Sequence, residues 1–207
     1  MNSYFNVSSS TENTIVIKRS KFICNVATVN DEQEAKNFIE SIKKKHSLAT
    51  HNCYAYIADE KGLVQKFSDD GEPQGTAGMP MLEVLKTRKF FKTVAVVTRY
   101  FGGVLLGAGG LVRAYSSSVS ECLDVCKSIS MELATEFNVK LDYNVYSKTV
   151  GFFNSENVKI IDTDFSNGVS LNLAVKEGYK NTFVSKLIDI SIGTAKITEL
   201  STKFIGF

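Results

Sequence analysis

A glycine-rich stretch flanked by arginines is the segment of this sequence best suited to hold an anion. Glycine lets the backbone approach a ligand closely and adopt positive φ. Unpaired N–H groups at a helix N-terminus attract anions, and arginine binds phosphate or carboxylate through two parallel hydrogen bonds. TRYFGGVLLGAGGLVRAYSSS, residues 98–118, therefore predicts an anion site. Its candidate residues are Arg99, Gly102, Gly103, Gly107, Gly109, Gly110 and Arg113.

Standard nucleotide motifs do not explain this stretch. Gly102 and Gly107 have the first spacing of a P-loop, but Ala108 and Gly109 stand where Lys and Ser or Thr are required. A G-x-G-x-x-G motif that starts at Gly107 fails at Val112. The alternative is that the glycines permit tight turns and close packing of a helix on a strand. The sequence leaves both interpretations open.

A second candidate is the acidic loop SDDGEPQGTAG, residues 68–78. The oxygens of Asp69, Asp70 and Glu72 are suited to a hard cation such as Mg²⁺, although the ligand spacing of an EF-hand is absent. The alternative is an acidic turn at the surface, where Asp and Gly favour positive φ. We favour the turn, and no metal is assigned.

His51 and Cys53 lie on one face of a predicted strand, since residues i and i+2 point the same way. Two ligands are too few for zinc, and the spacing does not favour a Cys–His nucleophile. We expect His51 to make a structural or ligand hydrogen bond. The sequence shows no complete catalytic set and assigns no cofactor, so enzymatic activity stays open.

Composition indicates an ordinary globular protein with enough apolar residues for a core. The net charge of +2 neither requires nor excludes nucleic acid. No signal peptide or membrane segment is expected, and the four scattered cysteines are typical of reduced thiols in a cytoplasmic protein.

The chain divides near residue 128, because all arginines, histidines and prolines lie before it. The first part reads as mixed α and β, with a helix over 31–45 capped by Asn30 and a second helix over 81–88. A buried strand over 92–101 leads into the glycine stretch, from which a helix starts near 108 or 109 and ends near 127. Further strands are predicted at 14–17, 21–29, 51–59 and 63–68.

The second part predicts a β-α-β-β-α-β order, which is the ferredoxin-like arrangement. Strands are expected at 136–142, 158–163, 169–176 and 195–204, with helices at 143–153 and 180–190. Phe183, Val184, Leu187 and Ile188 are expected to face inward. The third strand lacks the aromatic residues of an RNA-recognition domain. We therefore predict an α+β protein with domains at 1–128 and 129–207.

Four segments carry a resemblance to a known family. They are KRSKFI (18–23), ATHNCYAY (49–56), FSDDGEPQGTAGMPMLEVL (67–85) and VAVVTRYFGGVLLGAGGLVRAY (95–115). The chain resembles the IMPACT/YigZ family, as a bacterial-type two-domain member without the RWD domain of eukaryotic IMPACT. One departure is Met79, where many relatives have arginine before the proline.

The resemblance implies a fold for each domain and a function related to translation. The first domain is expected to resemble domain 2 of ribosomal protein S-five, and the second to resemble domain V of elongation factor G. Eukaryotic IMPACT is a translational regulator that acts through its RWD domain, and a groove with affinity for nucleic acid or the ribosome is the usual suggestion for the family. Both candidate loops fall in its signature segments, so their residues are expected to line one surface or to pair with each other.

Three functions are compatible with these features. The favoured one is a non-enzymatic binding protein that acts near translation, with RNA or a ribosome-associated factor as partner. The second is a phosphate-binding enzyme or sensor with a Mg²⁺-dependent site. The third is a protein–protein adaptor. The oligomeric state and the ligand are not predicted.

Overall fold

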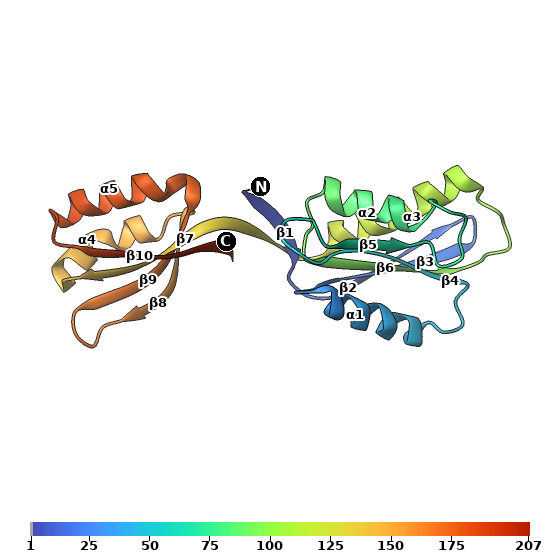
Figure 1. The fold of residues 1–207 in the computed structure, drawn as a ribbon, viewed down its shortest axis with the longest axis horizontal. Helices are drawn as coiled ribbons and strands as arrows, with labels where there is room; N and C mark the ends of the chain where they lie inside the picture. Colours follow the sequence, from blue (N-terminus) through green and yellow to red (C-terminus); the bar gives the residue numbers. More distant parts are fainter. Residues whose placement is uncertain (1) are drawn as a thin grey trace. The chain divides into compact units, whose positions relative to one another are not determined.

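The computed structural model describes residues 2–207, which form two compact units (Figure 1). One unit comprises residues 3–129, and the other comprises Asn2 and residues 130–207. Each has its own sheet and its own hydrophobic core. The predicted α+β class is confirmed.

The first unit is built on an antiparallel sheet with strand order β2-β3-β6-β4-β5. Its central strand, β6, is buried along almost its whole length, as its run of Val and Ala predicts. The elements in chain order are β1 (Ser3–Val7), β2 (Thr11–Ile17), β3 (Ser20–Thr28), α1 (Glu32–Lys45), β4 (His51–Ile57), β5 (Gln65–Ser68), α2 (Gly78–Thr87), β6 (Thr93–Tyr100) and α3 (Ala108–Val125).

Helices cover both faces of this sheet (Figure 1). Helix α1 packs on one face through its apolar stripe of Ala35, Ile39 and Ile42. Helices α2 and α3 pack on the other face and share a larger core that includes Met81 and Tyr115. The buried side of α3 brings Tyr115 against the loop between β5 and α2, which is where the candidate site forms.

Helix α1 is capped by Asp31 rather than by Asn30. Asp31 Oδ1 accepts a hydrogen bond from the Glu34 backbone N–H at 2.8 Å, and Glu34 Oε2 accepts one from the Asn30 N–H at 2.8 Å. Glu34 thus reaches back to Asn30, the residue before the cap, rather than to the cap itself as in a capping box. The predicted cap was one residue early, because Asn and Asp are both good cap residues and stand next to each other at 30 and 31.

The second unit has the ferredoxin-like order that the sequence predicts. Its antiparallel strands follow the order β10-β7-β9-β8, and one face carries both helices. The elements are β7 (Ser128–Leu141), α4 (Tyr143–Phe153), β8 (Val158–Asp164), β9 (Val169–Lys176), the 3₁₀ turn η1 (Glu177–Tyr179), α5 (Lys180–Ser191) and β10 (Lys196–Gly206).

The inward face of α5 differs in one residue from the expectation. Phe183 and Leu187 are fully buried, and Val184 packs partly against the same core. Ile188, which was expected to face inward, is 46% exposed. One turn of the helix has room for fewer apolar side chains on its buried side than the sequence offers.

Candidate functional site

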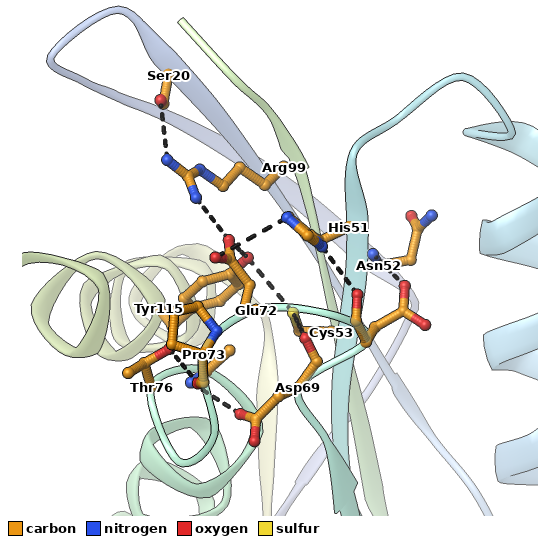
Figure 2. Close-up of polar contacts among 12 residues, drawn as sticks. Ser20, His51, Asn52, Cys53, Asp69, Glu72, Pro73, Thr76, Arg99 and Tyr115 are labelled. Atoms are coloured by element: carbon orange, nitrogen blue, oxygen red, sulfur yellow. Dashed lines mark hydrogen bonds and ion pairs between the residues drawn. The ribbon is translucent and has the colours of Figure 1, made fainter. Parts of the chain in front are cut away.

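The centre of the candidate site is a buried ion pair between the acidic loop and the end of β6. Arg99 Nη1 lies 2.6 Å from Glu72 Oε1, and the two side chains are 6% and 3% exposed. The Tyr115 hydroxyl donates to the same oxygen at 2.8 Å (Figure 2). Arg99 Nη2 also lies 3.4 Å from Ser20 Oγ. The candidate anion ligand Arg99 is therefore already paired with a carboxylate.

Asp69 holds the loop to the start of α2. Its carboxylate accepts three backbone hydrogen bonds, from Gly75 at 2.8 Å, Ala77 at 3.0 Å and Gly78 at 2.9 Å. A carboxylate at this end of a helix satisfies free N–H groups and complements the helix dipole. This cap explains why α2 begins at Gly78, three residues before the predicted start.

Asp70 ties the loop to α1 and β4. Its carboxylate accepts a hydrogen bond from the Asn52 N–H at 2.7 Å and lies 3.1 Å from Lys43 Nζ. Its φ of 43° lies in the left-handed region, as expected of Asp in a turn. All three candidate carboxylates thus have partners within the protein. Among residues 2–207, no group of three or more His, Cys, Asp and Glu side chains is placed to hold a metal ion.

His51 is fixed by the same loop. Its Nδ1 lies 2.8 Å from the Asp70 carbonyl oxygen, so Nδ1 carries a proton, because a carbonyl only accepts. Its Nε2 lies 3.9 Å from Glu72 Oε2 (Figure 2). The hydrogen bond that the sequence predicts for His51 is made to the backbone of the acidic loop.

Cys53 does not act with His51. Its Sγ lies 2.9 Å from the Asp69 carbonyl oxygen and 3.4 Å from the Tyr115 hydroxyl, inside the core. Burial raises the pKa of the Cys53 thiol to about 12. The thiol therefore stays protonated at neutral pH and is a poor nucleophile.

A hollow of about 440 Å³ lies against the ion pair, and we call it the His51 hollow. His51, Glu72 and Arg99 give it a polar side, and the start of α3 contributes Gly107 and Ala108. Its apolar lining comprises Pro73, Phe101, Leu105, Leu106 and Leu111. The end of β6, the acidic loop and the glycine stretch thus meet around one cavity.

The glycines have different physical roles. A Cβ on Gly102 would lie 2.0 Å from the Arg19 carbonyl carbon, so the two backbones are in close contact. Gly103 and Gly107 have φ of 82° and 71°, which few other residues adopt. Gly109 and Gly110 lie in the first turn of α3, and a Cβ on Gly109 would meet nothing within 4 Å. Close packing explains Gly102, and turn geometry explains Gly103 and Gly107.

Arg113 lies elsewhere. It is exposed and lines a second hollow, of about 240 Å³, together with Lys18, Leu106 and Gly110. Arg99 and Arg113 therefore line different hollows. Lys18 and Arg19 form the turn between β2 and β3, with φ of 45° and 67°, and the backbone of Arg19 contacts Gly102.

Lys18, Arg19 and Arg113 form what we call the cationic cluster. All three are exposed, and none lies within 4 Å of a carboxylate oxygen among the residues that the structure describes. Of these three residues, only Arg113 was predicted from the sequence as a site residue. The signal that was available for the others is their place in KRSKFI, directly before a strand that enters the core.

No helix within residues 2–207 combines the length and the apolar character that crossing a membrane requires.

Comparison with known proteins reveals a family likeness along most of the chain. Residues 18–123 match the family model described as the Impact N-terminal domain. IMPACT family member YvyE of Bacillus subtilis is 44% identical over 199 residues, which cover 96% of this chain and 92% of that protein. IMPACT family member YigZ of Escherichia coli is 37% identical over 183 residues, which cover 87% and 90%.

A solved structure has the same fold. Described as the crystal structure of an hypothetical protein, it is 33% identical to this chain with a TM-score of 0.61. The match covers 97% of this chain and 98% of that one.

Proposed function

This chain belongs to the IMPACT family, and we propose that it is a non-enzymatic binding protein that acts near translation and contacts RNA through the cationic cluster. Membership of this family points to translation-related regulation. We further propose that residues 1–128 and 129–207 are separate domains and that the first carries the contact.

The observation that carries the proposal is the cationic cluster itself. Its three cations are exposed and unpaired among the described residues, and Arg113 lies in the second turn of α3. Exposed arginine and lysine without carboxylate neighbours bind phosphates and release counterions. A helix N-terminus adds partial positive charge nearby.

Arg99 and the acidic loop have a supporting part in this proposal. Arg99 is only 6% exposed and its Nη1 is already paired with Glu72, so we do not assign it a phosphate contact. Instead it fixes the end of β6, from which the glycine stretch starts. The stretch brings its backbone against Arg19 at Gly102 and so sets the place of the β2–β3 turn.

Fluorescence anisotropy of labelled single-stranded and double-stranded RNA over a salt series tests the proposal. We expect affinity to fall with salt, and the Lys18→Gln/Arg113→Gln variant to lower the log–log slope by roughly 1.5 to 2, the share of two phosphate contacts. The control is Lys44→Gln/Lys148→Gln, which removes the same charge from two exposed lysines elsewhere. Absence of binding at low salt, or equal slopes for both variants, contradicts the proposal.

A protein–protein adaptor is the second candidate, favoured by a separate observation. Leu105, at the tip of the glycine stretch, is 82% exposed, and its neighbour Val104 is 38% exposed. Exposed apolar side chains that gather on one loop are typical of a protein contact. A partner that is retained after nuclease treatment and is lost with Leu105→Ser would support the adaptor over RNA binding.

A further inference from the structure

We propose that the His51 hollow binds a primary alkylammonium group, with Glu72 Oε2 and His51 Nε2 as acceptors for its N–H bonds. The proposal is independent of RNA binding, because Lys18 and Arg113 of the cationic cluster line a different hollow. It rests on two observations: two acceptors without donors at the polar side of the hollow, and an apolar lining.

The two oxygens of Glu72 have unequal surroundings. Oε1 accepts hydrogen bonds from Arg99 and Tyr115, whereas Oε2 accepts none from any residue within 2–207. Its closest polar neighbour is His51 Nε2, at 3.9 Å, which exceeds hydrogen-bond length. A carboxylate oxygen normally has a hydrogen-bond partner, so Oε2 is a free acceptor for a ligand donor in the hollow that Glu72 lines.

His51 presents a second acceptor at the same place. Its Nδ1 proton is committed to the Asp70 carbonyl oxygen, so in the neutral ring Nε2 has only a lone pair to offer. Two acceptors 3.9 Å apart, one of them charged, are best joined by a group with several N–H donors and a positive charge. An ammonium group has three such donors.

The placement of charge in the lining favours a cation beside Glu72 Oε2. Glu72 and Arg99 are the charged residues that line the hollow, and Arg99 is paired with Oε1. An anionic ligand at Oε2 would meet the Glu72 carboxylate directly, at a cost that burial increases.

The rest of the lining favours an alkyl chain on the cation. Phe101, Leu105, Leu106 and Leu111 form apolar walls, and Phe101 is 48% exposed. An alkyl stem against these side chains removes apolar area from water, worth roughly 0.8 kcal/mol per buried CH₂. A bare ammonium or a hydrated metal ion gains nothing from such walls. Lysine side chains of a protein partner and small free amines both carry this chemistry.

NMR titration of the ¹⁵N-labelled full chain at pH 8 with n-butylammonium is the direct test. We expect saturable shifts at the amides of Gly71, Gly107 and Ala108, with a Kd on the order of 1 mM. Three matched probes separate the contributions: n-butanol lacks the charge, tetramethylammonium lacks the N–H donors, and butyrate reverses the charge. Binding of any of these as tight as n-butylammonium overturns the proposal, and so does tighter binding of n-butylguanidinium.

His51→Asn tests the acceptor without disturbing the ion pair. Asn keeps a donor near the position of Nδ1 and removes the acceptor at Nε2. We expect n-butylammonium to bind at least 5-fold more weakly, while His46→Asn, which changes the histidine outside the hollow, leaves the Kd unchanged. Lys18→Gln/Arg113→Gln should also leave it unchanged, which separates this site from the RNA contact. Equal Kd values for His51→Asn and the unmodified chain contradict the proposal.

Two further probes identify the source of the amine. Tighter binding of N-acetyl-lysine methylamide than of putrescine assigns the hollow to a lysine of a protein partner. The reverse order assigns it to a free diamine. Failure of both to displace n-butylammonium overturns the proposal.

Discussion

Arg99 on β6 and Glu72 in the acidic loop form a buried ion pair with an Nη1–Oε1 distance of 2.6 Å. Tyr115 of α3 donates to the same carboxylate oxygen, and Ser20 of β3 lies within reach of the guanidinium. Four segments far apart in the sequence therefore meet at one carboxylate–guanidinium pair. The pair joins the two signature loops through contacts inside the protein.

Removing one partner of this pair is expected to destabilise the fold strongly. Arg99→Met leaves the buried Glu72 carboxylate without its counter-charge, and such a loss costs about 3–5 kcal/mol of unfolding free energy. Urea unfolding measures it. The matched control is Arg88→Met, because Arg88 pairs with Asp124 at 2.7 Å in a half-exposed setting, and exposed pairs contribute about 0–1 kcal/mol.

The double variant Glu72→Gln/Arg99→Met separates pairing from burial. It removes both charges, so it leaves no buried charge unpaired. The loss of unfolding free energy in the double variant should therefore be smaller than the sum of the losses in Glu72→Gln and Arg99→Met. Strict additivity, or an Arg99→Met variant as stable as Arg88→Met, would show that the pair does not hold the loops together. If the Arg99→Met variant binds RNA more weakly, the fraction of that variant that is unfolded must be measured before the loss is assigned to the binding surface.

Local patterns predicted most of the elements. The apolar run of β6, the helical spacing of α3 and the β-α-β-β-α-β order of the second unit are all visible in the sequence, since each depends on neighbouring residues. β1 was not predicted, because only Tyr4 and Val7 of its five residues are buried and the alternation is weak. The long strand β7 was predicted to start eight residues late, at 136.

The residues of the candidate site were predicted from the sequence, but the contacts between them were not. Glu72 and Arg99 are both predicted site residues, but their sequence positions do not decide whether they bind a ligand or each other. Twenty-seven positions separate them, and no local pattern specifies which distant carboxylate an arginine will meet. The partner of Tyr115 was hidden for the same reason, since its spacing indicates only a buried helix position.

Substitution by alanine is expected to change stability in opposite directions at Gly102 and Gly109. Gly102→Ala should destabilise the first unit by several kcal/mol, because its Cβ would lie 2.0 Å from the Arg19 backbone and the β2–β3 turn would have to move. Gly109→Ala should stabilise it by up to about 1 kcal/mol, because Gly109 is helical and a Cβ there meets nothing within 4 Å. Thermal unfolding of both variants checks the contrast, and equal melting temperatures would contradict it.

Removing the charge of Asp69, which caps the start of α2, is expected to lower the free energy of unfolding. Asp69→Asn replaces a carboxylate that accepts three backbone N–H bonds, so one amide NH₂ must face a donor. We expect a loss of about 1–3 kcal/mol in unfolding free energy. Asp59→Asn is the control, because Asp59 accepts a single bond, from the Val64 N–H at 2.9 Å. A loss no larger than the control's would mean that the three bonds do not stabilise the loop.

Cys53 predicts a loss of stability at alkaline pH. Burial raises the pKa of its thiol from 9.0 to about 12 in the folded protein, so between pH 9 and 12 the unfolded chain has released this proton while the folded chain keeps it. The unfolded state then binds fewer protons, and the free energy of unfolding falls as pH rises. Burial also raises the pKa of Tyr115, which acts in the same direction.

The contribution of Cys53 to the free energy of unfolding is expected to be complete below pH 9. Above pH 9 it should fall by at most about 1.4 kcal/mol per pH unit. Cys53→Ser keeps a donor for the Asp69 carbonyl oxygen and does not titrate in this range, so urea unfolding at pH 8, 9 and 10 should give a shallower slope for this variant. Cys126→Ser, at a half-buried thiol, should change the slope less. If the slopes of the Cys53→Ser variant and the unmodified chain coincide, the thiol does not stay protonated in the folded core, and its role as an unreactive part of the site would have to be abandoned.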